Sequence, residues 1–150
     1  DSKQLSEKKR EALFDEIQEK AVSFGIGIVS AQVIDEINIL QATYEAMRKA
    51  IEALSVKPDL LLADAVTIPH LSLPQQAIIK GDAKSVSIAA ASILAKVTRD
   101  RMMKEYDLLY PSYGFAQNKG YGAAAHVEAL KTYGPCPIHR RSFLKNFGIE

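Results

Sequence analysis

Two short, wholly apolar runs constrain the fold of this chain more than any other feature. Leu60-Leu61-Leu62-Ala63 is followed at once by Asp64, and Ala77-Ile78-Ile79 is followed within three residues by Asp82. Runs of this length without polar alternation are typical of strands that are buried on both faces, as in parallel sheets covered by helices. The two runs therefore predict a central sheet with a carboxylate close to the end of each strand.

Amphipathic helices are predicted on both sides of these strands. Ser6 is suited to cap the first helix, and Ser30 or Asp35 can cap the second. Between them, Phe24-Gly25-Ile26-Gly27-Ile28-Val29 is expected to form a further strand. A third helix begins near Lys84, and a fourth begins at Gly122. The four predicted helices end near residues 23, 54, 110 and 133.

This order of elements predicts an α/β fold, with a central mixed sheet flanked by helices and a C-terminal helical region. The 150 residues suit a single domain, with about 1–110 as its core and about 111–150 as a C-terminal helical part that binds nucleic acid. A sheet with so few strands has an unpaired edge. Because residue 1 is also not a Met, we expect that N-terminal strands are missing.

Composition excludes several classes of protein. No apolar run approaches ~18 residues, so no membrane span is expected. The opening residues Asp1-Ser2-Lys3-Gln4 are polar and do not resemble a signal peptide. The single cysteine, Cys136, cannot form an internal disulfide, which favours a reducing, cytoplasmic setting.

Charge is unevenly divided along the chain. Residues 1–95 hold 10 Lys/Arg against 13 Asp/Glu, whereas residues 96–147 hold 9 Lys/Arg against 4 Asp/Glu. A basic C-terminal third beside a mildly acidic remainder fits a polyanion-binding flank next to a carboxylate site. Random scatter of charge around neutrality is the alternative interpretation.

Asp64 and Asp82 are candidate ligands of a divalent cation. Ligands of open α/β folds collect outside the carboxyl ends of the strands, and carboxylate oxygens there can bind hard cations. Both aspartates follow adjacent apolar strands, so both could project from one edge of the sheet. The alternatives are structural: an Asx-turn at Asp64, or a helix N-cap in which Asp82 accepts from the backbone amide of Ser85 or its neighbour.

A glycine-rich turn and a basic cluster are candidate nucleic-acid contacts. Gln117-Asn118-Lys119-Gly120-Tyr121-Gly122 opens a predicted helix, and an exposed Tyr121 between two glycines could pack on a sugar or base. Arg140 and Arg141 carry guanidinium groups that match phosphate oxygens. His139 beside them suits either acid–base chemistry or a structural hydrogen bond. The alternatives are a plain loop and a solvated basic turn. No role is assigned to the remaining histidines, His70 and His126.

Three motifs follow one another along the chain. The first runs from Lys80-Gly81-Asp82-Ala83-Lys84-Ser85 through residues 88–93 to Lys96-Val97-Thr98-Arg99-Asp100. The second is Lys119-Gly120-Tyr121-Gly122, and the third spans residues 138–143. Together with residues 1–6, these motifs resemble ribonuclease HII, the type 2 ribonuclease H, of bacterial type. The resemblance covers nearly the whole chain and implies a ribonuclease-H-like α/β core.

The resemblance implies a metal-dependent nuclease. The family uses four carboxylates to hold two Mg²⁺ or Mn²⁺ ions, and two of them correspond to Asp64 and Asp82, as catalytic and metal-binding residues. The other two belong to an Asp-Glu-Ala-Gly-Arg-Gly motif that does not occur in these 150 residues. Tyr121 corresponds to the tyrosine that senses the 2′-hydroxyl. The implied nucleic-acid-binding residues are Lys3, Lys119, Tyr121, Arg140, Arg141 and Ser142.

The implied activity is that of an endoribonuclease. It hydrolyses the RNA strand of RNA–DNA hybrids and nicks duplex DNA on the 5′ side of embedded ribonucleotides, as in ribonucleotide excision repair, by two-metal-ion catalysis. Because half of the carboxylates are absent, we expect this chain to be inactive by itself. An exposed sheet edge could also support self-association. The competing hypotheses are a non-catalytic nucleic-acid-binding module and a structural fragment without activity of its own.

Overall fold

The computed structural model describes residues 2–149, which form two compact units. The first unit comprises the residues up to Ile28 together with Thr43–Val97. The second comprises Val29–Ala42 together with the residues from Thr98 onward. A functional division near residue 110 stays a prediction from the sequence.

The first unit contains the two strands and the helices around them. Ser6 caps its first helix as predicted, because the Ser6 side chain accepts a hydrogen bond of 3.2 Å from the Lys9 amide. Two helices continue from this unit into the second. The elements wholly inside the first unit are η1 (Ser2–Gln4), α1 (Glu7–Lys20), β1 (Leu61–Asp64), β2 (Gln75–Ile78) and α4 (Gly81–Lys84). The two shared helices are α3 (Ile39–Glu52) and α5 (Val86–Leu109).

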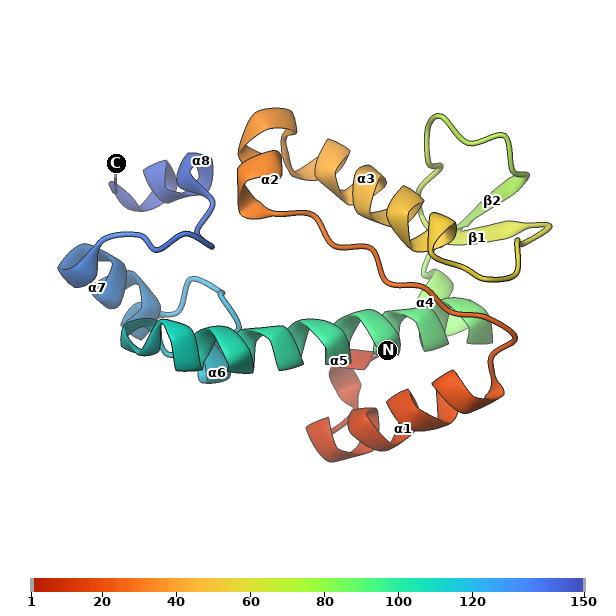
Figure 1. Cartoon of the computed structure of the whole chain (residues 1–150), viewed down its shortest axis with the longest axis horizontal. Helices are drawn as coiled ribbons and strands as arrows, with labels where there is room; N and C mark the ends of the chain where they lie inside the picture. The colour runs from red at the N-terminus through yellow and green to blue at the C-terminus, as the bar shows by residue number, and fades with distance from the viewer. Residues whose placement is uncertain (1, 150) are drawn as a thin grey trace. The chain divides into compact units, whose positions relative to one another are not determined.

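The second unit is helical. Its core forms where the segment after α5 folds back against the C-terminal end of that helix (Figure 1). Neither α5 nor any other helix between residues 2 and 149 is long and apolar enough to cross a membrane. The elements wholly inside this unit are α2 (Ala31–Ile37), η2 (Pro111–Tyr113), α6 (Phe115–Asn118), α7 (Ala124–Tyr133), α8 (Arg141–Leu144) and η3 (Lys145–Phe147).

The two predicted strands exist and pair in parallel. Leu61 lies opposite Gln75 and Asp64 lies opposite Ile78, so the carboxyl ends of β1 and β2 coincide. The ladder continues one step further through the Ala65 amide, which donates to the Ile78 carbonyl at 2.9 Å. Among the described residues the sheet has these two strands, so it is parallel where the sequence suggested a mixed sheet.

The prediction of a strand over residues 24–29 is wrong. No strand is formed there in the described chain, and Gly25 and Gly27 lie instead against the backbone of α3. A Cβ atom on Gly27 would overlap the carbonyl oxygen of Ala46 and lie 2.8 Å from the Ala50 nitrogen. The alternating glycines therefore allow this segment to pack closely on a helix. In the sequence, the same alternation resembles that of a strand.

The single helix predicted to end near residue 54 is interrupted at Asn38. Asn38 has a φ of 72°, in the left-handed region that asparagine tolerates better than most residues, and it ends α2. Its side chain then accepts from the Gln41 amide at 3.0 Å, which satisfies a free donor at the start of α3. Ser30 rather than Asp35 caps α2, through the Val33 amide at 3.3 Å.

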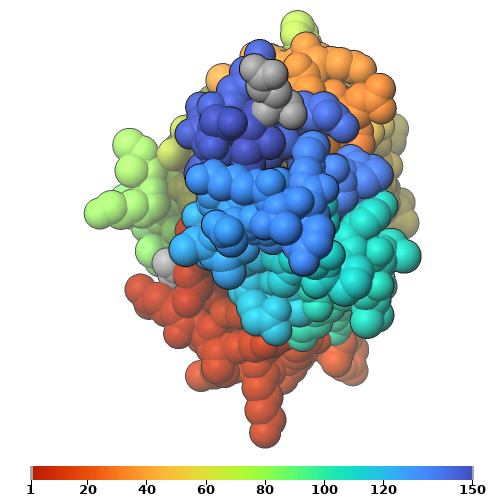
Figure 2. Space-filling model, turned by 90° about the vertical axis from the view of Figure 1, so that its left-hand side faces the viewer, coloured from red at the N-terminus to blue at the C-terminus, as the bar shows by residue number. Residues whose placement is uncertain are grey.

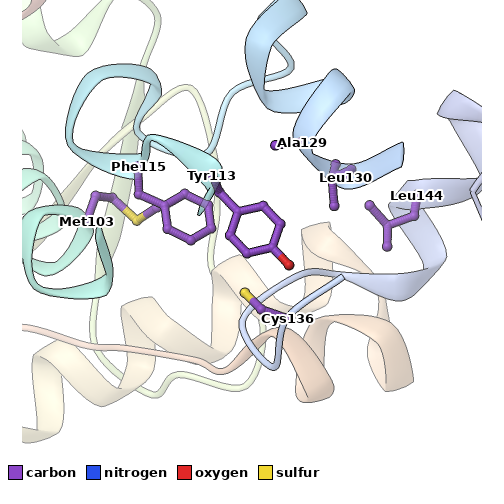
Figure 3. Packing of buried hydrophobic residues seen from close by; sticks show 7 residues of the cluster. All are labelled: Met103, Tyr113, Phe115, Ala129, Leu130, Cys136 and Leu144. Carbon is purple, nitrogen blue, oxygen red and sulfur yellow. The ribbon is translucent and has the colours of Figure 1, made fainter. Parts of the chain in front are cut away.

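Each unit has its own apolar core. In the first, Phe14 of α1 packs with Ile93, Leu94 and Val97 of α5, all less than 10% exposed. In the second, Phe115 is 1% exposed and stacks on Tyr113 with ring centroids 5.3 Å apart. Figure 3 shows this second cluster, in which residues from α5, η2, α6, α7 and α8 converge. The remaining members of the second cluster are Met103, Ala129, Leu130, Cys136 and Leu144.

Candidate active site

Asp64 is the last residue of β1 and is tied to the turn after β2. Its Oδ1 accepts a hydrogen bond of 2.9 Å from the Gly81 amide. Gly81 is buried, and a Cβ atom there would lie 3.3 Å from the Asp64 Cα and 2.7 Å from the Ile88 Cδ1. Only glycine allows the two backbones to approach this closely without a shift in a neighbour. The bond reaches across 17 residues, so it is not the local Asx-turn that the sequence left open.

Asp82 follows directly after Gly81 and so lies at the same end of the β1–β2 pair as Asp64. It is half-buried, in the first turn of α4. The alternative role as an N-cap is not observed. Lys80 occupies the cap position, and the Ser85 amide donates to the Gly81 carbonyl at 2.8 Å. Ser85 in turn ends α4 with extended backbone and accepts from the Ile88 amide at the start of α5.

Two non-glycine residues with left-handed backbone flank these aspartates. Ala65 (φ 59°) follows Asp64, and Lys80 (φ 55°) precedes the Gly81–Asp82 step. This conformation costs an ordinary L-residue roughly 1–2 kcal/mol. Backbone strain of this kind concentrates at functional sites, where the surrounding structure holds it in place. It therefore adds a second, independent reason to regard this end of the sheet as a site.

The predicted turn with Tyr121 is built from backbone and side-chain hydrogen bonds. The Asn118 side chain accepts from the Gly120 amide at 2.8 Å and donates to the Tyr113 carbonyl at 2.6 Å. The Lys119 carbonyl accepts from Arg99 at 3.0 Å, and Lys119 itself is left-handed at φ 54°. The Tyr121 side chain is 62% exposed, as the sequence predicted. An aromatic ring thus projects into solvent from a firmly bonded turn.

The basic cluster is held by a carboxylate from another helix. Asp35 of α2 accepts from the Arg141 amide at 2.9 Å, the Ser142 amide at 3.1 Å and the Ser142 hydroxyl at 2.5 Å. The hydrogen bond from the Ser142 hydroxyl is the main reason that the pKa of Asp35 is lowered. Figure 2 shows the C-terminal segment in blue against the orange α2. Arg140 lies over the Phe143 ring, 4.4 Å from its centroid, a cation–π arrangement.

The candidate residues fall into two groups, one in each unit. Asp64, Asp82 and the exposed Lys3 of η1 belong to the first unit. Lys3 is adjacent to the buried Ser2, whose hydroxyl lies 3.1 Å from that of Ser92. The candidates in the second unit are Lys119, Tyr121, Arg140, Arg141 and Ser142.

Comparison with known proteins decides the family. The sequence model of the ribonuclease HII family matches residues 1–146. This chain belongs to the ribonuclease HII family. The ribonuclease HII of Lachnoclostridium phytofermentans is 72% identical over 146 residues, and that of Clostridioides difficile is 61% identical over 146 residues. Each alignment covers 97% of this chain, but only 58% and 57% of the two relatives, so the chain spans little more than half of their length.

A solved structure supports the fold of this chain. The crystal structure of the ribonuclease H2 from Pyrococcus horikoshii OT3 has a TM-score of 0.79 and 28% sequence identity, and it covers 99% of this chain and 81% of that one. The predicted α/β fold of the ribonuclease H type is thereby confirmed.

Two contacts within the candidate nucleic-acid-binding part were not predicted from the sequence. His126, to which no role was assigned, is only 4% exposed, and its Nε2 lies 3.0 Å from the Nε2 of His139. Asp35, considered only as a cap of its own helix, binds the basic cluster instead. Neither contact has a sequence signal, because the partners are 13 and more than 100 residues apart.

The half-buried His139 predicts how the stability of this chain depends on pH. Burial, and then the neighbouring His126, lower the pKa of His139 from 6.5 to about 4. Between these two pH values the unfolded chain binds a proton that the folded chain does not. The free energy of unfolding should therefore fall as the pH drops from 6.5 to 4, and this group should not change it above 6.5. Because His139 is partly exposed, we expect the free energy of unfolding to fall by about 1–2 kcal/mol, which is less than the shift in pKa alone would give.

Urea denaturation at a series of pH values measures this effect. His139→Asn keeps an acceptor near the Cys136 amide but removes the titrating ring, so its pH dependence should be shallower than that of the unaltered chain. His70→Asn, at an exposed histidine, is the matched control and should leave the slope unchanged. Equal slopes for the unaltered chain and His139→Asn would contradict the prediction.

Proposed function

We propose that these 150 residues supply two of the four carboxylates of an endoribonuclease. Its substrates are RNA–DNA hybrids and duplex DNA with embedded ribonucleotides, which it cuts on the 5′ side of the ribonucleotide. The observation that carries the proposal is the common position of Asp64 and Asp82 at the carboxyl end of the parallel β1–β2 pair, joined through the Gly81 amide. Ligands of α/β folds bind at this end of the strands.

The donor chemistry at this end of the sheet fits a hard divalent cation. Asp64 and Asp82 offer carboxylate oxygens, which Mg²⁺ and Mn²⁺ prefer. Among residues 2–149, no group of three or more His, Cys, Asp or Glu side chains is placed to hold a metal ion. We infer that Asp64 and Asp82 are part of a larger ligand set, whose other carboxylates belong to the Asp-Glu-Ala-Gly-Arg-Gly motif that these 150 residues lack. When bound, the two ions activate water and stabilise the leaving oxygen.

Recognition of the nucleic acid is assigned to the second unit and to Lys3. Tyr121 presents an exposed ring that can contact the sugar and its 2′-hydroxyl, the group that distinguishes RNA from DNA. The guanidinium groups of Arg140 and Arg141 bind phosphate oxygens, and Lys3 and Lys119 add positive charge. Ser142 contributes by fixing this segment to Asp35.

The chain alone should not cut such a substrate. Two carboxylates cannot neutralise two divalent ions as four do, and Mg²⁺ demands near-octahedral oxygen coordination. We therefore expect no nicking when the 150-residue chain is incubated with Mn²⁺ and a duplex that carries one ribonucleotide. Specific nicking that is abolished by Asp64→Asn would contradict this prediction. Salt-dependent binding that is indifferent to both Mg²⁺ and Asp64→Asn would favour a non-catalytic binding module.

The outer edges of β1 and β2 should allow self-association. A short sheet whose edge groups are unpaired can add strands from a second copy, and a symmetric dimer is the simplest closed arrangement. The apolar residues immediately outside the strands are exposed, with Leu60 before β1 at 52% and Ile79 after β2 at 72%. Light scattering should show a mass that rises with protein concentration, and a monomer at all concentrations would contradict this expectation.

A further inference from the structure

Two histidines connect the Tyr121 backbone to the C-terminal segment by a line of hydrogen bonds. The Cys136 amide donates to Nδ1 of His139 at 2.9 Å. Nε2 of His139 lies 3.0 Å from Nε2 of His126, and Nδ1 of His126 lies 2.7 Å from the Tyr121 carbonyl oxygen. Every ring nitrogen of the pair therefore has a partner.

The positions of the ring protons follow from the two ends of this line. A backbone amide can only donate, so Nδ1 of His139 must accept, and a neutral His139 then carries its proton on Nε2. That proton is donated to His126, whose Nε2 must accept and whose own proton therefore lies on Nδ1. There it meets the Tyr121 carbonyl, which can only accept. One arrangement of protons satisfies all three contacts.

An additional proton has no place in this arrangement. On Nδ1 of His139 it would face the amide of Cys136, and on Nε2 of His126 it would face the proton of His139. In either position two hydrogen-bond donors would face each other, and one of the hydrogen bonds would be lost. The pair is enclosed by the rings of Tyr113 and Phe115, whose centroids lie 4.9 Å and 5.6 Å from that of His139. The Cys136 thiol, whose pKa is raised by burial, and the Tyr113 hydroxyl, which donates to the Gly134 carbonyl, also belong to this surrounding.

Hydrogen bonds are needed to fix the backbone of Tyr121, because both of its neighbours are glycines. It lies between Gly120 (φ 86°) and Gly122, residues that restrict the backbone least. Its amide donates to the Asn118 carbonyl at 2.9 Å, and its carbonyl accepts from both the Ala123 amide and His126. The main chain that carries the exposed ring is therefore hydrogen-bonded at both the amide and the carbonyl of Tyr121.

We propose that His126 and His139 are positioning residues, which fix the Tyr121 backbone so that its phenol hydroxyl meets the 2′-hydroxyl of the substrate. This inference rests on the proposed function, in which Tyr121 distinguishes RNA from DNA. His126 acts directly on the Tyr121 carbonyl. His139 acts through His126, by determining which of its nitrogens carries the proton.

Nitrogen-15 NMR of the histidine rings tests the proton arrangement in the unaltered chain. We expect His126 in the Nδ1–H form and His139 in the Nε2–H form at neutral pH. Each form has its own pair of ring-nitrogen shifts, so the two can be told apart in one spectrum. The Nε2–H form at His126, or the Nδ1–H form at His139, would overturn the inference.

Two substitutions of the same histidine separate positioning from general stability. In His126→Asn the amide group lies near the Nδ1 position and can still donate to the Tyr121 carbonyl. In His126→Gln it lies near the Nε2 position and keeps the contact with His139 but loses Tyr121. The readout is the binding preference for a duplex with one ribonucleotide over the same all-DNA duplex, measured by fluorescence anisotropy in Mg²⁺.

We expect His126→Gln and Tyr121→Phe each to reduce this preference roughly two- to tenfold, the range of one hydrogen bond. His126→Asn should retain it within about twofold. If the preference is lost in Tyr121→Phe but kept in His126→Gln, or lost equally in His126→Asn and His126→Gln, the positioning role is wrong. If the unaltered chain shows no preference, Tyr121 does not distinguish RNA from DNA in this chain, and that part of the proposed function fails together with the inference.

Discussion

Gly27→Ala should destabilise the first unit by about 3 kcal/mol or more, the upper end of the range for overpacking in a core. The added methyl group would overlap the Ala46 carbonyl oxygen and lie 2.8 Å from both the Ala46 carbon and the Ala50 nitrogen. These are backbone atoms of a helix, so relief requires a shift of α3 or of the segment that precedes it. Urea denaturation followed by circular dichroism measures the loss.

Gly148→Ala is the control for this substitution. Gly148 has a φ of 69° but no atom lies within 4 Å of its added Cβ among the described residues, so only backbone strain is introduced. We expect a cost of about 1 kcal/mol there. If Gly27→Ala costs no more than Gly148→Ala, residues 24–29 do not pack on α3.

The second large effect is expected at the aspartates, once the ligand set is complete. The test protein is a chimera that joins this chain to the part of the Lachnoclostridium phytofermentans relative that it does not cover. Such a chimera should nick a duplex with one ribonucleotide in Mn²⁺. Asp64→Asn and Asp82→Asn should each lower the rate more than 100-fold, because loss of an outer partner of a metal ligand already costs about 10–100-fold.

Asp59→Asn provides the matched control in the same chimera. Asp59 is an exposed carboxylate only five residues before Asp64, so its loss changes the charge equally without touching the end of the strands. Its rate should stay within about twofold of the unaltered chimera. Rates for Asp64→Asn or Asp82→Asn that match Asp59→Asn would show that these aspartates do not hold the metal.

The sequence predicted the part of the fold in which local pattern and burial agree. The apolar runs before Asp64 and Asp82 form β1 and β2, although β2 begins two residues before the predicted strand. Because β1 and β2 pair in parallel, both aspartates lie at the same end of the strand pair. That these aspartates bind metal remains a prediction.

The errors arise where a local pattern has two physical explanations. Alternating Gly25 and Gly27 suit a strand and equally suit a backbone that approaches a helix, and the position of α3 decides between them. At Asn38 the apolar periodicity continues on both sides of a left-handed residue, which conceals the break. The pairing of His126 with His139 depends on how α7 and the following loop fold together.

The contact of Asp35 with α8 has a consequence for biosynthesis. Its partners lie 106 and 107 residues further along the chain, so they leave the ribosome long after Asp35 does. Until then α2, a helix of seven residues, lacks this tertiary contact, and isolated helices of that length are marginal in water. We therefore expect α2 to become stably ordered only after α8 has left the ribosome.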